Sequence, residues 1–264
     1  MSNATTTPNP MLWVPGWAAT PRTFRPLQQR LPGCEHVCVD FRGVTTSDNF
    51  LGRVKDAILE NAVVIGWSMG AMLALQAAAE SESVAAVVVI NGTLRFASDD
   101  RAFGWPTPIL RRMQKRLTTD AEATVTQFVE SMFVNPATAQ SYIEACHHGN
   151  VLAESAFDRP ALIAGLDYLA TTDLTASVAN FTCPVLWLQG TDDRVCPGSA
   201  ARQSVELLPN CTLREIPAGH APFYEQPDET ATAIKAFLHS LNPERYEAPS
   251  ASVTSSRNST DLRC

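Results

Sequence analysis

Residues 62–75 read Ala-Val-Val-Ile-Gly-Trp-Ser-Met-Gly-Ala-Met-Leu-Ala-Leu. A short apolar run comes first, and a run rich in Ala, Leu and Met follows it. These runs predict a buried strand over 62–66 and a tightly packed helix over 69–79. Glycines on either side of Ser68 allow a tight turn between the two elements. The stretch therefore predicts a nucleophilic Ser68, which projects from the end of the strand near the positive end of the helix dipole.

Short apolar runs and helical stretches alternate along most of the chain, which is typical of a parallel sheet with crossover helices. We expect an α/β fold with a mostly parallel sheet and flanking helices. Besides 62–66, the expected strands are 11–14, 37–40, 84–90, 185–188 and 212–216. Besides 69–79, the expected core helices are 197–208 and 227–241, each with Pro near its start.

The alternation stops over residues 97–172, where the sequence predicts helices only. They are expected at 108–117, 121–133, 137–147 and 159–169. Ligands of α/β sheets bind at the carboxyl ends of the strands, so we interpret 97–172 as a helical lid inserted between strands. The alternative is a helical subdomain that only adds stability. The core then comprises 11–96 and 173–241, between a flexible N-terminus over 1–10 and a disordered, polar tail over 242–264.

Composition excludes several classes of function. The chain has 264 residues and a formal net charge of −7, which argues against binding to nucleic acid. We find no apolar run long enough to span a membrane and no signal peptide at the N-terminus. The seven cysteines are scattered, with no Cys-x-x-Cys pair, which favours reduced thiols over disulfides or a zinc site. We therefore expect a cytoplasmic monomer without a metal or an organic cofactor.

A serine nucleophile needs a base, and in this type of enzyme the acid and then the histidine follow the serine along the chain. His220 follows the last expected strand, in a loop of small residues that would let an imidazole approach Ser68. Asp192 and Asp193 follow the strand 185–188, and both qualify as the acid. The other histidines are less suitable: His36 precedes the serine, His147 and His148 lie in the expected lid, and His239 lies near the end of the last helix.

The oxyanion of the intermediate needs backbone N–H donors. The residue after the nucleophile, Met69, would supply one donor. The loop after the first strand, Pro15-Gly16-Trp17, would supply the other through Trp17. The Trp17 ring could also form a wall of the acyl site.

These motifs resemble those of one family, the pimeloyl-acyl-carrier-protein methyl ester esterases of biotin synthesis, which are lidded carboxylesterases of the α/β-hydrolase superfamily. The resemblance covers about residues 11–241. It rests on Gly-Trp-Ser-Met-Gly at 66–70, on Gly-Leu-Asp-Tyr-Leu at 165–169, and on His-Ala-Pro-Phe at 220–223. The family's acid stands three residues after a glycine and four before a proline. Gly190 and Pro197 match that spacing and select Asp193.

The resemblance implies hydrolysis of a methyl ester on an acyl chain that is carried by acyl carrier protein. It also implies an apolar site for the acyl chain between Trp17, Met69 and the lid residues Phe128, Val129 and Met132. The chain departs from the family in two places. Pro15 replaces the histidine of the usual His-Gly-Trp. The lid positions where arginines dock the acidic carrier correspond to Ala123, Gln127, Gln140 and Glu144, while basic residues occur instead at Arg111, Arg112, Lys115 and Arg116.

Four other functions can be weighed against these residues. A general short-acyl carboxylesterase would use the same Ser68, Asp193 and His220 without a carrier protein. Carbon–carbon bond hydrolysis or perhydrolysis would also use them. A ligand-binding module without turnover would not need all three residues, which argues against it.

Overall fold

The computed structural model describes residues 8–148, 158–179 and 181–243. The predictions for the flexible N-terminus and for the polar tail fall almost entirely on residues outside these ranges. The six-stranded sheet has the order β2-β1-β3-β4-β5-β6, and every neighbouring pair is parallel. Its strands are β1 (Met11–Val14), β2 (His36–Cys38), β3 (Ala62–Trp67), β4 (Val84–Ile90), β5 (Val185–Gly190) and β6 (Cys211–Ile216).

The strand order reverses between β1 and β3. From β1 the chain crosses outward to the edge strand β2 and returns to β3 on the other side of β1. Such a reversal leaves a crevice at the carboxyl ends of the two strands, where α/β sheets bind their ligands. Ser68 directly follows β3, and Trp17 lies in the loop after β1, so the chain topology brings both residues to this crevice.

The central strands are apolar and buried on both faces. Every residue of β1, β3 and β5 is buried, whereas the edge strands β2 and β6 each have only one buried residue. This difference explains why continuous apolar runs predicted the inner strands within two residues of their bounds. The edge strand predicted at 37–40 begins and ends earlier, at His36–Cys38.

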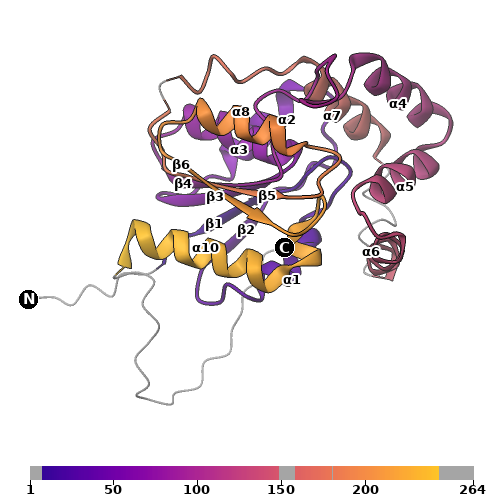
Figure 1. Cartoon of the computed structure of the whole chain (residues 1–264). Coiled ribbons are helices and arrows are strands. Elements are labelled where there is room, and N and C mark those ends of the chain that lie inside the picture. The colour runs from indigo at the N-terminus through magenta and orange to yellow at the C-terminus, as the bar shows by residue number, and fades with distance from the viewer. Residues whose placement is uncertain (1–7, 149–157, 180, 244–264) are drawn as a thin grey trace, which may run out of the picture.

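Helices cover both faces of the sheet (Figure 1). Helices α2, α3 and α8 lie on one face, and α1 and α10 lie on the other. The sequence predicted α3, α8 and α10 and missed the shorter elements and α2. Their bounds are η1 (Pro21–Phe24), α1 (Arg25–Gln28), α2 (Asp48–Asp56), α3 (Met69–Ala79), α8 (Gly198–Glu206), α9 (Pro222–Glu225) and α10 (Pro227–Leu241).

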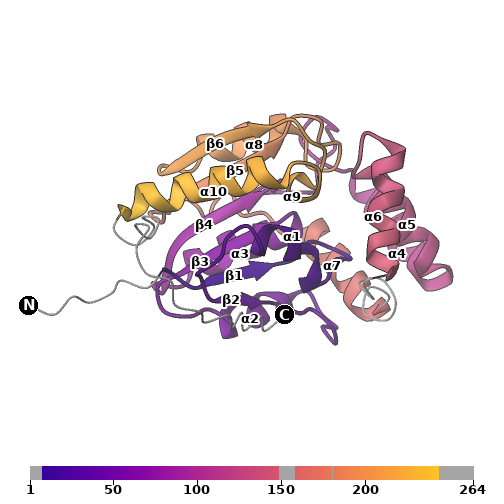
Figure 2. The same cartoon turned by 90° about the horizontal axis from the view of Figure 1, so that it is seen from below.

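A helical insertion between β4 and β5 confirms the predicted break in the alternation. It consists of α4 (Thr107–Thr119), α5 (Ala121–Ser131), α6 (Pro136–His148) and α7 (Arg159–Thr171). Figure 2 shows α4, α5 and α6 grouped beyond one end of the sheet, with α7 beside them. Two hydrogen bonds attach the insertion to the strand ends. Trp17 Nε1 donates to the carbonyl of Leu162 in α7 at 2.8 Å, and His220 N–H donates to the carbonyl of Met132 after α5 at 2.8 Å.

The cysteines differ in part from the prediction. Cys34, Cys183, Cys196 and Cys211 are free thiols. Cys38 is disulfide-bonded, so the prediction of reduced thiols is wrong at that position. Spacing along the chain does not reveal which cysteines pair. None of the helices in the described residues combines the length and the apolar character needed to cross a membrane.

Candidate active site

Ser68 lies at the sharp turn between β3 and α3. Its backbone has φ 57° and ψ −119°, a conformation that residues with a side chain rarely adopt. The two flanking glycines are required by close contact. A Cβ on Gly66 would lie 2.3 Å from the carbonyl oxygen of Gly70, and a Cβ on Gly70 would lie 2.1 Å from that of Val14. The predicted turn therefore forms, with Ser68 6% exposed beside the loop after β1.

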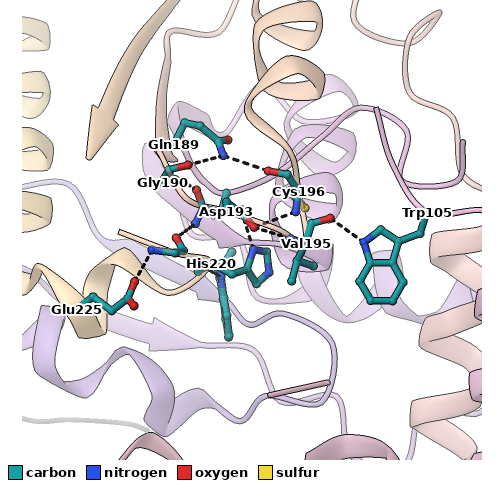
Figure 3. A network of polar contacts seen from close by, with 11 residues as sticks. Trp105, Gln189, Gly190, Asp193, Val195, Cys196, His220 and Glu225 are labelled. Atoms are coloured by element: carbon teal, nitrogen blue, oxygen red, sulfur yellow. Dashed lines mark hydrogen bonds and ion pairs between the residues drawn. The ribbon is translucent and has the colours of Figure 1, made fainter. Parts of the chain in front are cut away.

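Asp193 and His220 form a buried pair. Asp193 Oδ2 lies 2.8 Å from His220 Nδ1, and both side chains are fully inaccessible to solvent. The other carboxylate oxygen, Oδ1, accepts the N–H groups of Val195 at 2.8 Å and of Cys196 at 3.0 Å. Figure 3 shows the carboxylate between this backbone turn and the imidazole. The carboxylate is thus held in one orientation and can fix the orientation of the His220 ring.

Of the two aspartates that the residues alone left open, the structure brings only Asp193 to His220. Asp192 is exposed, and its carboxylate accepts a hydrogen bond from the Thr191 hydroxyl at 3.1 Å. Its backbone N–H donates to the carbonyl of Ala218 at 3.0 Å. Asp192 therefore helps to shape the loop, as a turn residue does.

The second ring nitrogen of His220, Nε2, is buried and has no hydrogen-bond partner among the described residues. Trp67, the residue before Ser68, holds the loop of His220 in place. Trp67 Nε1 donates to the His220 carbonyl at 2.8 Å, and the two rings lie 5.5 Å apart between centroids. An unpartnered buried nitrogen costs free energy, which a reacting hydroxyl could recover by hydrogen bonding.

Cys196 lies against this pair. Its thiol is buried, and its Sγ lies within 4.8 Å of ligand atoms of Asp193 and His220. Burial raises the pKa of the Cys196 thiol well above its ordinary value, and the Asp193 charge raises that pKa further, so the group remains a neutral thiol. The sequence did not single out Cys196, because nothing in its local pattern distinguishes it from a core cysteine.

Among the residues that the structure describes, one set of side chains could hold a metal ion. Potential ligand atoms of Asp193, Cys196 and His220 lie within 4.8 Å of one another. Two features of the set disfavour a metal. The Asp193 carboxylate is already engaged by His220 and by two backbone N–H groups, and a thiol must lose its proton to become a metal ligand. The arrangement therefore suits an acid–base pair better than a metal centre.

The expected oxyanion donors lie beside the serine. A Cβ on Gly16 would lie 3.2 Å from Ser68 Cβ, which places the loop that carries Trp17 directly against Ser68. Met69 is the first residue of α3, where N–H groups have no partner within the helix. The Trp17 ring is 3% exposed. Its edge-on contact with Phe128 has 4.9 Å between ring centroids.

The three lid residues predicted to line the substrate are buried at the end of α5 or just after it. Phe128, Val129 and Met132 are 8%, 2% and 3% exposed. Phe128 contacts Trp17, and Met132 binds the His220 loop through its carbonyl. The structure thus brings α5 to both sides of the predicted site, and a role in substrate binding stays a prediction.

Asn91 and Glu225 also shape the site, and the sequence reasoning missed both. Asn91 follows β4, is fully buried, and has a φ of 47°. Its amide donates to the Gly219 carbonyl at 2.9 Å and accepts the Gly190 N–H at 2.6 Å, so it joins the loop of the acid to the loop of the histidine. Glu225 accepts the N–H of Gly219 from the other side (Figure 3). The only signal in the sequence that could have pointed to Asn91 is its position just after a buried strand.

The remaining histidines lie elsewhere. His36, in β2, accepts a hydrogen bond from Trp13 Nε1 at 3.0 Å, and His239 is exposed near the end of α10. The side chains of His147 and His148 lie outside the described residues.

Comparison with known proteins assigns the chain to a family. A family model described as "Alpha/beta hydrolase family" matches residues 11–233. The chain belongs to the α/β-hydrolase family. That match covers the sheet, the turn at Ser68, the helical insertion and the loop of His220.

The curated relatives have one name in common. "Pimeloyl-[acyl-carrier protein] methyl ester esterase" of Xanthomonas campestris pv. campestris (strain B100) is 31% identical over 240 residues, which cover 86% of this chain and 93% of the relative. The protein of that name from Stenotrophomonas maltophilia (strain K279a) is 29% identical, covering 88% and 94%. Among solved structures, an esterase of Exiguobacterium antarcticum has a TM-score of 0.75 at 18% identity, covering 88% and 92%, which shows the shared fold.

Proposed function

We propose that this α/β-hydrolase is a serine carboxylesterase with Ser68 as nucleophile, His220 as base and Asp193 as the acid that orients His220. The observation that carries the proposal is the buried Asp193–His220 pair with an unpartnered Nε2. Ser68 lies at a turn whose backbone is strained, and Trp67 beside it donates to the His220 carbonyl at 2.8 Å. A strained serine near a histidine that is held by a buried carboxylate is the arrangement that acyl transfer requires.

In the proposed mechanism, Ser68 Oγ attacks the ester carbonyl while His220 Nε2 accepts the serine proton. The N–H groups of Trp17 and Met69 stabilise the oxyanion. The ester C–O bond breaks, and the alcohol leaves with the proton from His220. Water, activated by His220, then attacks the acyl-enzyme and releases the acid and free Ser68. The chain's own residues supply every group in this sequence.

For the substrate, we propose a methyl ester of an acyl chain, as in the pimeloyl-acyl-carrier-protein methyl esters after which the relatives are named. The apolar residues Trp17, Met69, Phe128, Val129 and Met132 would bind the acyl chain. In this role the protein would act in the cytoplasm as a monomer. A general short-acyl carboxylesterase is the second candidate. It is favoured by the lid positions Ala123, Gln127, Gln140 and Glu144, which carry no positive charge for an acidic carrier.

The test of the reaction is labelling of the protein by a fluorophosphonate probe together with hydrolysis of methyl esters. Ser68→Ala is expected to abolish labelling and to lower kcat by at least about 10⁴-fold, because no other group can form the acyl-enzyme. Ser141→Ala, at an exposed serine of α6, serves as the matched control and is expected to leave both unchanged. Labelling that persists in a folded Ser68→Ala protein would place the nucleophile elsewhere.

The two substrate classes are separated by a second measurement. Complementation of a biotin-requiring strain that lacks its own esterase is expected if the carrier-bound methyl ester is the substrate. Rapid turnover of p-nitrophenyl esters together with no hydrolysis of methyl pimeloyl carrier protein would select the general carboxylesterase.

A further inference from the structure

A cleft of about 290 Å³ opens between α4 and α5, beside the candidate active site. Four apolar residues line it: Trp105, Ile109, Met113 and Phe128. Arg112 and Arg116, both exposed residues of α4, line it too, together with Thr124, Gln127 and Ser131. A hollow of this size that combines apolar walls with two exposed arginines suits an amphiphile that carries a negative charge.

The cleft borders residues that pack near Ser68. Phe128 lines the cleft and also contacts the Trp17 ring, and the loop of Trp17 lies against the nucleophile. Trp105 lines the cleft beside Phe128, with 6.3 Å between ring centroids. Its Nε1 donates to the carbonyl of Val195 at 3.0 Å, in the turn that holds the Asp193 carboxylate (Figure 3). The cleft is therefore joined to the site by two aromatic rings.

The positive charges of Arg112 and Arg116 are not neutralised by ion pairs with described residues. In the described part of the chain, no carboxylate forms an ion pair with Arg112 or Arg116. Arg116 donates to the amide oxygen of Gln127 and also borders a second hollow that contains Asp120, Glu122 and Glu130. Arg112 lines the cleft and does not line that second hollow. Arg112 should therefore contribute more to the binding of an anion than Arg116.

We propose that this cleft binds the far end of the ester substrate, and that this end carries an anionic group, a carboxylate or a phosphate. The inference rests on the proposed esterase function and specifies its substrate class: a charged acyl ester rather than a wholly apolar one. The acyl chain would lie along Phe128 and Trp105, with its ester at Ser68 and its anion at Arg112 and Arg116. Guanidinium groups bind both anions through paired N–H donors, so the test must distinguish the two sources.

The experiment compares three methyl esters of equal chain length, whose far ends carry a methyl group, a carboxylate or a phosphate. Wild-type protein is expected to prefer the charged esters, measured as the ratio of kcat/KM for charged over uncharged ester. Arg112→Gln is expected to lower this preference about five-fold and Arg116→Gln somewhat less, as for partly screened charged hydrogen bonds. Arg111→Gln is the matched control, because Arg111 is exposed on the same helix but does not line the cleft.

Binding is measured separately by calorimetry. The methyl ester with a carboxylate at its far end is titrated into Ser68→Ala protein and into the double variant Ser68→Ala/Arg112→Gln. A five-fold weaker Kd in the double variant is expected, and added salt should reduce the difference. If the uncharged ester turns over and no variant changes the preference, the inference fails and the esterase function stands. If no ester turns over, the esterase function fails, and the calorimetric comparison still decides whether the cleft binds the anion.

Discussion

At the scale of single residues, the candidate site depends on side chains that hold two loops together rather than on the reacting groups alone. Asn91 is the clearest example, because its one amide serves both the Gly190 N–H and the Gly219 carbonyl. Gly190 ends β5, three residues before Asp193, and Gly219 directly precedes His220. A shift of either loop would lengthen the bond between the carboxylate and the imidazole and so weaken the control of the ring.

Replacement of Asn91 by Gly is expected to destabilise the protein by about 2–4 kcal/mol, because two buried backbone groups lose their partners. Glycine tolerates the positive φ at this position, so the loss reflects the hydrogen bonds and not backbone strain. The free energy of unfolding in urea measures the stability change. Turnover by the folded variant should also fall, chiefly in kcat. A variant with wild-type stability and turnover would show that the bridge between the loops is unimportant.

Glu225 offers a prediction about pH. Burial raises the pKa of its carboxyl above the ordinary value, the charges of Asp192 and Asp193 raise it further, and the Gly219 N–H opposes the shift. An acid whose pKa is higher in the folded state binds its proton more tightly there. Stability that comes from this group is therefore lost as the pH rises from the unfolded pKa through the folded pKa.

Glu225→Gln removes this ionisation and keeps an oxygen that can accept the Gly219 N–H. We expect the variant to gain in Tm relative to wild type at pH 8 and to gain less, or nothing, near pH 4. Thermal unfolding at both pH values measures the difference. Glu229→Gln, at an exposed glutamate of α10, controls for the loss of one negative charge. A difference in Tm that does not change with pH would contradict the assignment to ionisation.

At the scale of elements, α7 packs so tightly against the site that it tolerates no side chain at Gly165. A Cβ at this position would lie 2.7 Å from Trp17 Cδ1 and 3.3 Å from Met69 Sδ. Gly165 is thus the residue that lets the insertion approach both expected oxyanion donors. Close packing explains why the 165–169 motif begins with glycine, and the sequence alone did not give this explanation.

Gly165→Ala is expected to cost about 1–3 kcal/mol through overpacking and to lower kcat, because Trp17 or Met69 must move. Gly52→Ala is the matched control. Gly52 lies within α2, is exposed, and has open space where its Cβ would be. That substitution is expected to stabilise the protein by roughly 0.5–1 kcal/mol, through the helix propensity of Ala. Equal effects of the two substitutions on the free energy of unfolding would refute the packing argument.

At the scale of the whole molecule, chain topology assembles the site from distant segments. Ser68 follows β3, Asp193 follows β5 and His220 follows β6, and all three strands are parallel. Parallel strands end at the same edge of the sheet, so three loops far apart in sequence converge there. The insertion between β4 and β5 then adds α5 and α7 to the same edge.

Much of this could be predicted from the sequence. The strands 11–14 and 84–90 and the helices 69–79 and 227–241 were predicted with their observed bounds, because continuous apolar runs and helical periodicity are local properties. The helix α2 was missed because its mean hydropathy is low and its only buried residues are Phe50 and Val54. The edge strand β2 was misplaced because it is short and partly exposed.

The sequence by itself determined the fold class, the order of elements and the turn at Ser68, since each depends on residues that are neighbours along the chain. Apart from the family resemblance, only the tertiary structure decided which of Asp192 and Asp193 contacts His220. It also revealed Asn91, Cys196 and Trp105 as partners of the site. Those contacts join residues that are distant in sequence, for example the 90 positions between Trp105 and Val195. Their distances depend on how crossovers and helices pack in three dimensions, which no local pattern encodes.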